Sequence, residues 1–164
     1  MKKQIDLVGV ESGGVRLRAL RFDDLPLTLV WRTHERVRRQ FWHTDVVGAA
    51  EHIAWFRQYA ERSDDYVFIG EVDETAVGQV SIYDVKGVRA EFGRLIVGTR
   101  WLGLGYGLAL TKAAIEVARR LGVTNLYLSV RPENTKAIHI YQKAGFVTTA
   151  MAPDRIEMEI TIDG

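Results

Sequence analysis

The chain has 164 residues, of which 47% are hydrophobic, so it is the size of one ordinary domain and can bury a substantial core. Its 22 basic and 21 acidic residues nearly cancel, which excludes the overall positive field of a protein that binds nucleic acid non-specifically. There is no cysteine, so disulfides, thiolate metal sites and a cysteine nucleophile are excluded as well.

The beginning of the chain does not have the pattern of a targeting segment. Asp6, Gly9 and Glu11 interrupt the apolar run that a signal peptide needs, and no later stretch approaches the ~20 apolar residues of a membrane span. No repeat, low-complexity tract or linker rich in Pro, Gly and Ser divides the sequence. We therefore expect a single domain over residues 1–164, a cytoplasmic location and no membrane partner.

The first third predicts one strand and two helices. Residues 15–19 alternate Val, Leu and Ala with two arginines, a period typical of a half-buried strand. Asp23 and Asp24 before a proline form a helix start signal, and that helix is expected to run to about Glu35. A second helix is expected over 49–62, where apolar residues recur at spacings of three and four.

The middle of the chain changes to the period of strands. Tyr66 to Val72 and Ala76 to Tyr83 are two β-rich runs separated by a polar turn, which predicts an antiparallel hairpin. A third run, Val88 to Val97, leads directly into a glycine-rich segment. Tyr106 to Leu121 then carries an apolar stripe at helical spacing. Because this helix separates the third run from a short strand over 125–130, we expect those two strands to pair in parallel.

The end of the chain has clear start and stop signals. Asn134 is a helix N-cap, and that helix is expected to end at Gly145. Two strands follow, over 146–150 and 155–160, and the second could pair within the chain or across a homodimer. The whole order predicts an α+β fold, an α/β sandwich with a mixed, mostly antiparallel sheet of about seven strands and about four helices.

Residues 100–107 carry the strongest chemical signal, because glycines stand at 103, 105 and 107 at the start of a predicted helix. Glycine allows close backbone approach, and free N–H groups at a helix start bind phosphate, with Arg100 able to add a charged contact. A simple flexible turn is the alternative. A dinucleotide-binding turn fits poorly because its third glycine lies three residues after the second, and no Gly-Lys-Ser/Thr of a Walker loop follows.

Two motifs together resemble the GNAT superfamily of N-acetyltransferases. Arg100-x-x-Gly103-x-Gly105 is similar to its acetyl-CoA signature, and residues 131–146 resemble its last helix, where an Asn cap is followed by Ala, Tyr and Lys-x-Gly-Phe. The resemblance implies the GNAT acyl-CoA acyltransferase fold and an enzyme that uses acetyl-CoA as cosubstrate and no metal. It also implies a set of cofactor-binding residues: Leu95, Ile96, Val97, Arg100, Leu102, Gly103, Leu104, Gly105, Tyr106, Gly107, Leu108, Asn134 and Ala137.

The reaction needs a base that takes a proton from the amine and an acid that protonates the leaving thiolate. Tyr141 lies two turns beyond Asn134 on the same helix face and is the expected acid, with a core tyrosine as the alternative. Glu91 is the expected base because even steps along its strand separate it from Gly93 and Leu95. The alternative for Glu91 is an exposed strand glutamate with no catalytic role. The alternative for Asn134 is a helix cap that does not contact the ligand.

The residues that select the acceptor are expected in the first third of the chain. There, arginines (Arg32, Arg36, Arg38, Arg39) mix with aromatic residues (Trp31, Phe41, Trp42, Trp55). In their spacing, Trp31-Arg32, Val37-Arg38 and Glu51-His52-x-x-Trp55-Phe56 resemble GNAT enzymes that acetylate nucleotide-linked amino sugars. We therefore expect a nucleotide-linked amino sugar or another small primary amine as acceptor, and no direct nucleic-acid partner. A protein N-terminal or lysine acetyltransferase and a non-catalytic acyl-CoA-binding module are the alternatives. The structural alternative is that the arginines form a solvated helix face and the tryptophans a core. The sequence leaves monomer and homodimer open.

Overall fold

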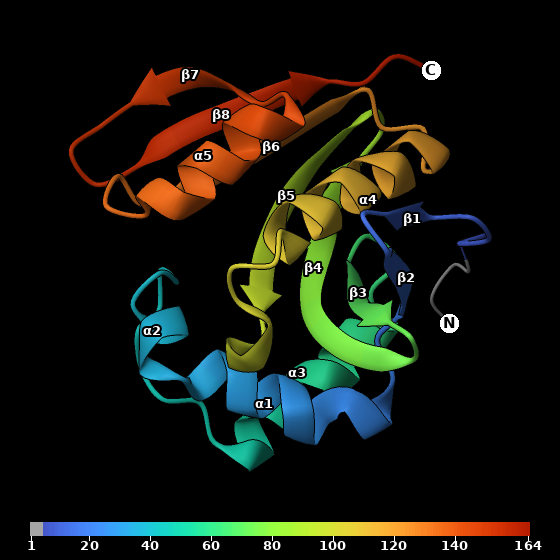
Figure 1. Cartoon of the computed structure of the whole chain (residues 1–164), viewed down its shortest axis with the longest axis vertical. Helices are drawn as coiled ribbons and strands as arrows, with labels where there is room; N and C mark the ends of the chain where they lie inside the picture. The colour runs from blue at the N-terminus through green and yellow to red at the C-terminus, as the bar shows by residue number, and fades with distance from the viewer. Residues whose placement is uncertain (1–4) are drawn as a thin grey trace.

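The centre of the protein is one eight-stranded sheet with the strand order β1-β2-β3-β4-β5-β6-β8-β7 (Figure 1). A computed structural model describes residues 5–164, so the first four residues of the expected domain lie outside the described part. The strands are β1 Glu11–Ser12, β2 Val15–Ala19, β3 Tyr66–Val72, β4 Thr75–Lys86, β5 Arg89–Val97, β6 Asn125–Val130, β7 Val147–Met151 and β8 Ile156–Thr161. The helices are α1 Leu25–Thr33, α2 Glu35–Arg38, α3 Ala49–Glu61, α4 Tyr106–Arg120 and α5 Thr135–Ala144, with short 3-10 turns at Phe22–Asp24 and Thr99–Trp101.

The α+β fold and the mixed, mostly antiparallel sheet are confirmed. β5 and β6 pair in parallel as predicted, and the remaining neighbours pair antiparallel. β8 pairs within the chain on both sides, with β6 and with β7. The described residues hold one strand and one helix more than expected, because β1 has two residues and α2 has four, too few to produce a sequence period.

Helices cover both faces of the sheet. Phe68 belongs to a core beneath α4, which packs on β4 and β5 and contacts α5 (Figure 1). Its neighbours Val67 and Ile69 point the other way and join a second core with α1 and α3. Successive strand residues point to opposite faces, so one strand supplies both cores. None of the helices in residues 5–164 combines the length and apolar character that a membrane crossing requires.

Local signals place most helix ends correctly. Gly145 has φ +111°, and Asn134 Oδ1 accepts a hydrogen bond from the Ala137 N–H at 3.4 Å. The first helix departs from expectation and ends at Thr33, because His34 is extended (ψ 131°) and α2 begins at the next residue. The Asp24 side chain does not bond the first turn of α1; its carboxylate accepts from the Arg18 guanidinium at 2.6 and 2.8 Å.

A bulge at Arg94 reverses the alternation of β5. Gln79 and Ser81 of β4 pair with Ile96 and Gly93, so two steps on β4 face three steps on β5. Arg94 has φ +52°, a strained value for a side chain of this size. Its guanidinium donates to the buried Asp65 carboxylate at 2.7 and 3.2 Å, which holds the bulge in place.

The bulge corrects one sequence argument. Phe92 packs in the core beneath α4, and Leu95 packs against that same core although it is three positions, an odd number, further along the strand. Glu91 lies next to Phe92 on an unbroken part of the strand, so its side chain points to the opposite face. The even spacing from Glu91 to Leu95 therefore does not place them on one face.

Candidate active site

A cavity opens where β5 and β6 separate. Their parallel pairing consists of three residue pairs, from Arg89 with Asn125 to Glu91 with Tyr127. Beyond these pairs β5 stays with β4 and β6 stays with β8. Residues of both strands then line a cavity of about 500 Å³. The inner wall comprises Phe92, Gly93, Arg94, Leu95, Leu128, Ser129, Val130, Asn134 and Tyr141.

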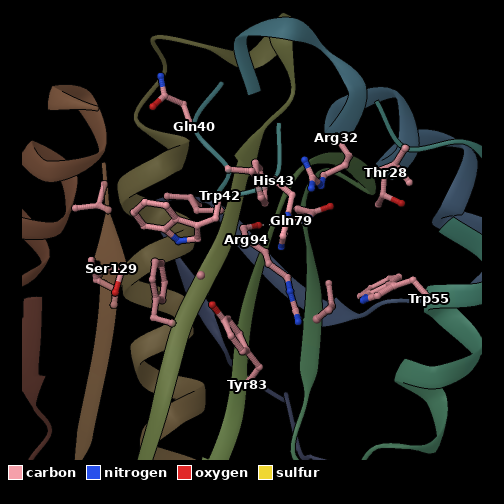
Figure 2. A pocket seen from close by; sticks show the side chains of 18 of the residues that line it. Thr28, Arg32, Gln40, Trp42, His43, Trp55, Gln79, Tyr83, Arg94 and Ser129 are labelled. Carbon is pink, nitrogen blue, oxygen red and sulfur yellow. Dashed lines mark hydrogen bonds between the residues drawn. The ribbon is translucent and has the colours of Figure 1, made fainter. Parts of the chain in front are cut away.

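The outer wall comes from the first third of the chain. Arg32 reaches in from α1, Trp42 and His43 from the segment after α2, and Trp55 from α3 (Figure 2). The Trp55 indole stacks on the His52 ring with centroids 5.6 Å apart. A cavity with aromatic walls and a few polar groups is typical of a small-molecule site.

Tyr141 stands at the inner wall as a buried phenol. Its ring packs edge-on against Phe92 at 5.5 Å and Phe146 at 5.9 Å, which fixes its orientation. Burial raises the pKa of Tyr141 well above its usual range, so the group is a neutral phenol at pH 7. Asn134 lines the same cavity from the helix cap. The structure thus brings the expected acid and the cap residue together.

Glu91 does not line this cavity. It lines a second, smaller cavity with Arg89, Tyr127 and residues of β8. Its carboxylate accepts a hydrogen bond of 2.6 Å from the Tyr83 hydroxyl, and Tyr83 does line the main cavity (Figure 2). Burial and the bond to Glu91 raise the pKa of Tyr83. Sequence reasoning missed Tyr83, because only the register of β4 against β5 places it opposite Glu91.

The glycine loop has two kinds of glycine. Gly103 and Gly105 have φ +77° and +83°, and a Cβ at either would stand in open space. Gly107 is buried, and a Cβ there would lie 2.8 Å from Ile140 Cδ1, so the end of the Ile140 side chain would have to shift to admit it. The free N–H groups at the start of the 15-residue helix α4 follow Gly105 directly. This open cradle at a helix start fits a phosphate group.

The other expected cofactor residues lie around this loop and strand. Leu95 lines the cavity, whereas the Ile96 side chain is buried in the second core. The Val97 carbonyl accepts a 3.4 Å bond from Arg36. Arg100 is exposed, with its guanidinium 5.5 Å from the Trp101 ring centroid. Leu102 and Leu104 are exposed, whereas Tyr106, Leu108 and Ala137 are half-buried.

The aromatic and basic residues of the first third have different places. Trp31 is a core residue, which agrees with the alternative that the tryptophans form a core. Trp42 is 41% exposed and lines the cavity. Among the four arginines considered, Arg32 lines the cavity. The others bond to groups of the chain itself: Arg36 to the Val97 carbonyl, Arg38 to the Thr33 and Thr44 carbonyls, and Arg39 to the Glu35 carboxylate. Within residues 5–164, no group of three His, Asp or Glu side chains could hold a metal ion.

Comparison with known proteins decides the family. A model of the acetyltransferase (GNAT) domain matches residues 15–147. The chain belongs to the GNAT acetyltransferase family. It is therefore an acyltransferase that uses acetyl-CoA to acetylate an amine.

Individual relatives of this GNAT acetyltransferase agree with the assignment. The spermidine N(1)-acetyltransferase of Escherichia coli (strain K12) is 30% identical over 135 residues, which cover 80% of this chain and 72% of that protein. The spermidine N-acetyltransferase of Vibrio cholerae, solved in complex with CoA and spermine, superposes with a TM-score of 0.83 at 22% identity and covers 90% of this chain and 95% of its own. A domain from Methanocaldococcus jannaschii has a TM-score of 0.79 at 19% identity, covering 90% and 98%. These structures share the fold.

Proposed function

We propose that this GNAT acetyltransferase acetylates the primary amine of a small molecule bound in the cavity between β5 and β6. The carrying observation is that Tyr141 and Asn134 line one wall of the cavity, while aromatic and basic residues of the first third line the other. A cavity of about 500 Å³ with aromatic walls and a few polar groups suits a small acceptor.

The glycine loop supplies the proposed binding site for the pyrophosphate of acetyl-CoA. Gly103 and Gly105 leave open space next to the N-terminus of α4, and Arg100 can add a charged contact. Leu95 would contact the arm that leads into the cavity, with Asn134 nearer the thioester end. Bound acetyl-CoA supplies the acetyl thioester that the amine attacks.

Two residues of the chain carry the proposed proton transfers. Tyr141 holds its phenol proton at neutral pH and donates it to the departing sulfur. Glu91 acts as base through Tyr83, because its carboxylate bonds the Tyr83 hydroxyl outside the cavity wall. Tyr83 would accept a proton from the amine as it gives its own to Glu91. This order fits the raised pKa of Tyr83, which disfavours a free phenolate.

The residues that line the cavity limit which amine can be proposed as the acceptor. Two of the relatives, from Escherichia coli and Vibrio cholerae, are named for spermidine, a polycationic amine. The nucleotide-linked amino sugar expected from the sequence is a larger, anionic alternative whose base could stack on Trp42 or Trp55. We place a small amine first, because the same cavity must also admit the acetyl end of the cosubstrate.

Thiol release and thermal unfolding test this function. Acetyl-CoA at a hundred times its Kd should stabilise the protein by about 2.7 kcal/mol, and small primary amines should then release free CoA thiol. Stabilisation without thiol release from any amine would favour the non-catalytic binding module. Release with N-terminal peptides but with no small amine would favour the protein acetyltransferase. No stabilisation would remove the pyrophosphate site.

A further inference from the structure

Arg32 brings an uncompensated positive charge to the acceptor side of the cavity. It lies in the last turn of α1, and its half-buried side chain turns into the pocket (Figure 2). Its Nη1 atom is buried without a hydrogen-bond partner, a property shared in residues 5–164 by the Ser81 hydroxyl alone. A buried guanidinium N–H with no acceptor is costly unless a ligand supplies one.

The carboxylates around the cavity do not neutralise this charge. Asp65 accepts both bonds from Arg94, and Glu91 accepts the bond from Tyr83. Glu51 lines the rim and is exposed, and no carboxylate in residues 5–164 forms an ion pair with Arg32. Burial lowers the pKa of Arg32 with no acidic neighbour to raise it.

The other basic groups of the cavity do not need an anion in the same way. Arg94 is already paired with Asp65. Burial, and next the charge of Arg32, lower the pKa of His52, so its ring is neutral at pH 7 and shares a 2.8 Å hydrogen bond with Thr28. His43 is exposed at the rim. Among the half-buried and buried residues that line the cavity, Arg32 is therefore the one whose charge is not balanced by an ion pair.

The Arg32 guanidinium has a restricted orientation that suits a planar ligand group. Its Cζ lies 4.0 Å from the centroid of the Phe41 ring, a cation–π contact that restricts its orientation. A guanidinium offers two parallel N–H groups that match the two oxygens of a carboxylate. One cation balances one carboxylate, whereas a phosphate dianion usually needs more than one.

We propose that Arg32 binds a carboxylate of the acceptor, so that the substrates are primary amines that also carry a carboxylate. This inference rests on the proposed function, because it places the acceptor in the cavity beside Tyr141. It separates this enzyme from the relatives named for spermidine, since a polycation in the cavity would be repelled by the unpaired charge of Arg32.

The test compares acceptors that differ by one carboxylate. The panel holds the proteinogenic L-amino acids, the amines formed by their decarboxylation, spermidine, O-phosphoethanolamine and a nucleotide-linked amino sugar. Thiol release gives kcat and KM for wild type, for Arg32→Gln and for Arg39→Gln. Arg39 is the matched control, because it is an exposed arginine of the same segment that pairs with Glu35 and does not line the cavity.

We expect at least one amino acid to exceed its decarboxylated amine by tenfold or more in kcat/KM. Arg32→Gln should lower kcat/KM for that amino acid roughly 10- to 100-fold, mainly through KM, because a charge-assisted bond to the substrate is lost. The kcat/KM for the decarboxylated amine should not fall in Arg32→Gln, because this acceptor has no carboxylate and its positive charge is repelled by Arg32. The thermal shift caused by acetyl-CoA should stay at the wild-type value. Arg39→Gln should match wild type with every acceptor.

Three results would overturn the inference. The first is equal or better use of decarboxylated amines, spermidine or the phosphate-bearing acceptors. The second is an equal loss for all acceptors in Arg32→Gln, which would make Arg32 structural. The third is a normal acetyl-CoA shift with no amino acid acetylated. Failure of the proposed function itself looks different, since acetyl-CoA would then not stabilise the protein and no acceptor of any kind would release thiol.

Discussion

Replacing Tyr141 by Phe should separate catalysis from folding. The ring packs against Phe92 and Phe146, and Phe keeps this ring, so the substitution opens no cavity. The hydroxyl is the one group removed. We expect the free energy of unfolding to change by no more than about 1 kcal/mol. If the phenol protonates the departing sulfur, kcat should fall roughly 10²- to 10⁴-fold, the usual contribution of a positioned acid.

Tyr59→Phe provides the opposite outcome as a control. The buried Tyr59 hydroxyl accepts a 3.0 Å hydrogen bond from the Val67 N–H and does not line the cavity. Its removal leaves a buried N–H of β3 without this partner, which should lower the free energy of unfolding by about 1–3 kcal/mol. Turnover by the folded fraction should stay at the wild-type value.

Urea unfolding and single-turnover thiol release, measured for both variants, decide the question. Single turnover isolates the chemical step from product release. A Tyr141→Phe enzyme that retains wild-type single-turnover rates would show that the phenol is a packing residue and that another group, or water, protonates the sulfur. A large loss of stability in the same variant would contradict the packing argument.

Three further substitutions test the loop, the sheet and an ion pair. Gly105→Ala should cost about 1 kcal/mol of stability, because φ is +83°, and should weaken acetyl-CoA binding at least about tenfold in a thermal-shift titration; unchanged affinity would refute the cradle. Gly78→Ala should lower the free energy of unfolding by about 1–3 kcal/mol in urea, since its Cβ would lie 2.4 Å from the Ile96 carbonyl oxygen; wild-type stability would contradict this contact. Burial raises the pKa of Asp24, but the hydrogen bonds from Arg18 and Arg21 lower it by more, so the net pKa lies below the ordinary value of 3.8. Asp24→Asn should therefore cost about 1–3 kcal/mol at pH 7, a difference that is present above about pH 3.8 and disappears as the pH falls through the folded pKa; a constant difference in acid would refute the role of the charge.

The sequence was informative where a structure depends on neighbouring residues. Asn134 and Gly145 mark the ends of α5 because capping and the left-handed conformation are local requirements. The parallel pairing of β5 and β6 followed from the helix between them, and the family followed from two short motifs. These features involve few residues in fixed spacing.

The sequence was uninformative where distant segments meet. The bulge at Arg94 depends on Asp65, 29 residues earlier, and it breaks the alternation on which the argument for Glu91 relied. The link from Glu91 to the cavity runs through Tyr83 and needs the register of two strands. Arg32 differs from the other arginines of its segment only by where α1 packs on the sheet, and no local pattern encodes that.

The bulge also decides which face of the sheet each β5 residue beyond position 94 points to. Ala90 and Phe92 belong to the core beneath α4, whereas Ile96, again an even-numbered residue, belongs to the core beneath α1 and α3. Loss of residue 94 alone would restore strict alternation and match β5 to β4 step for step, while Phe92 and Ile96 would keep their present layers. A single-codon deletion here would therefore shorten the strand by only about 3.3 Å and remove the ion pair with Asp65 without exchanging the two layers.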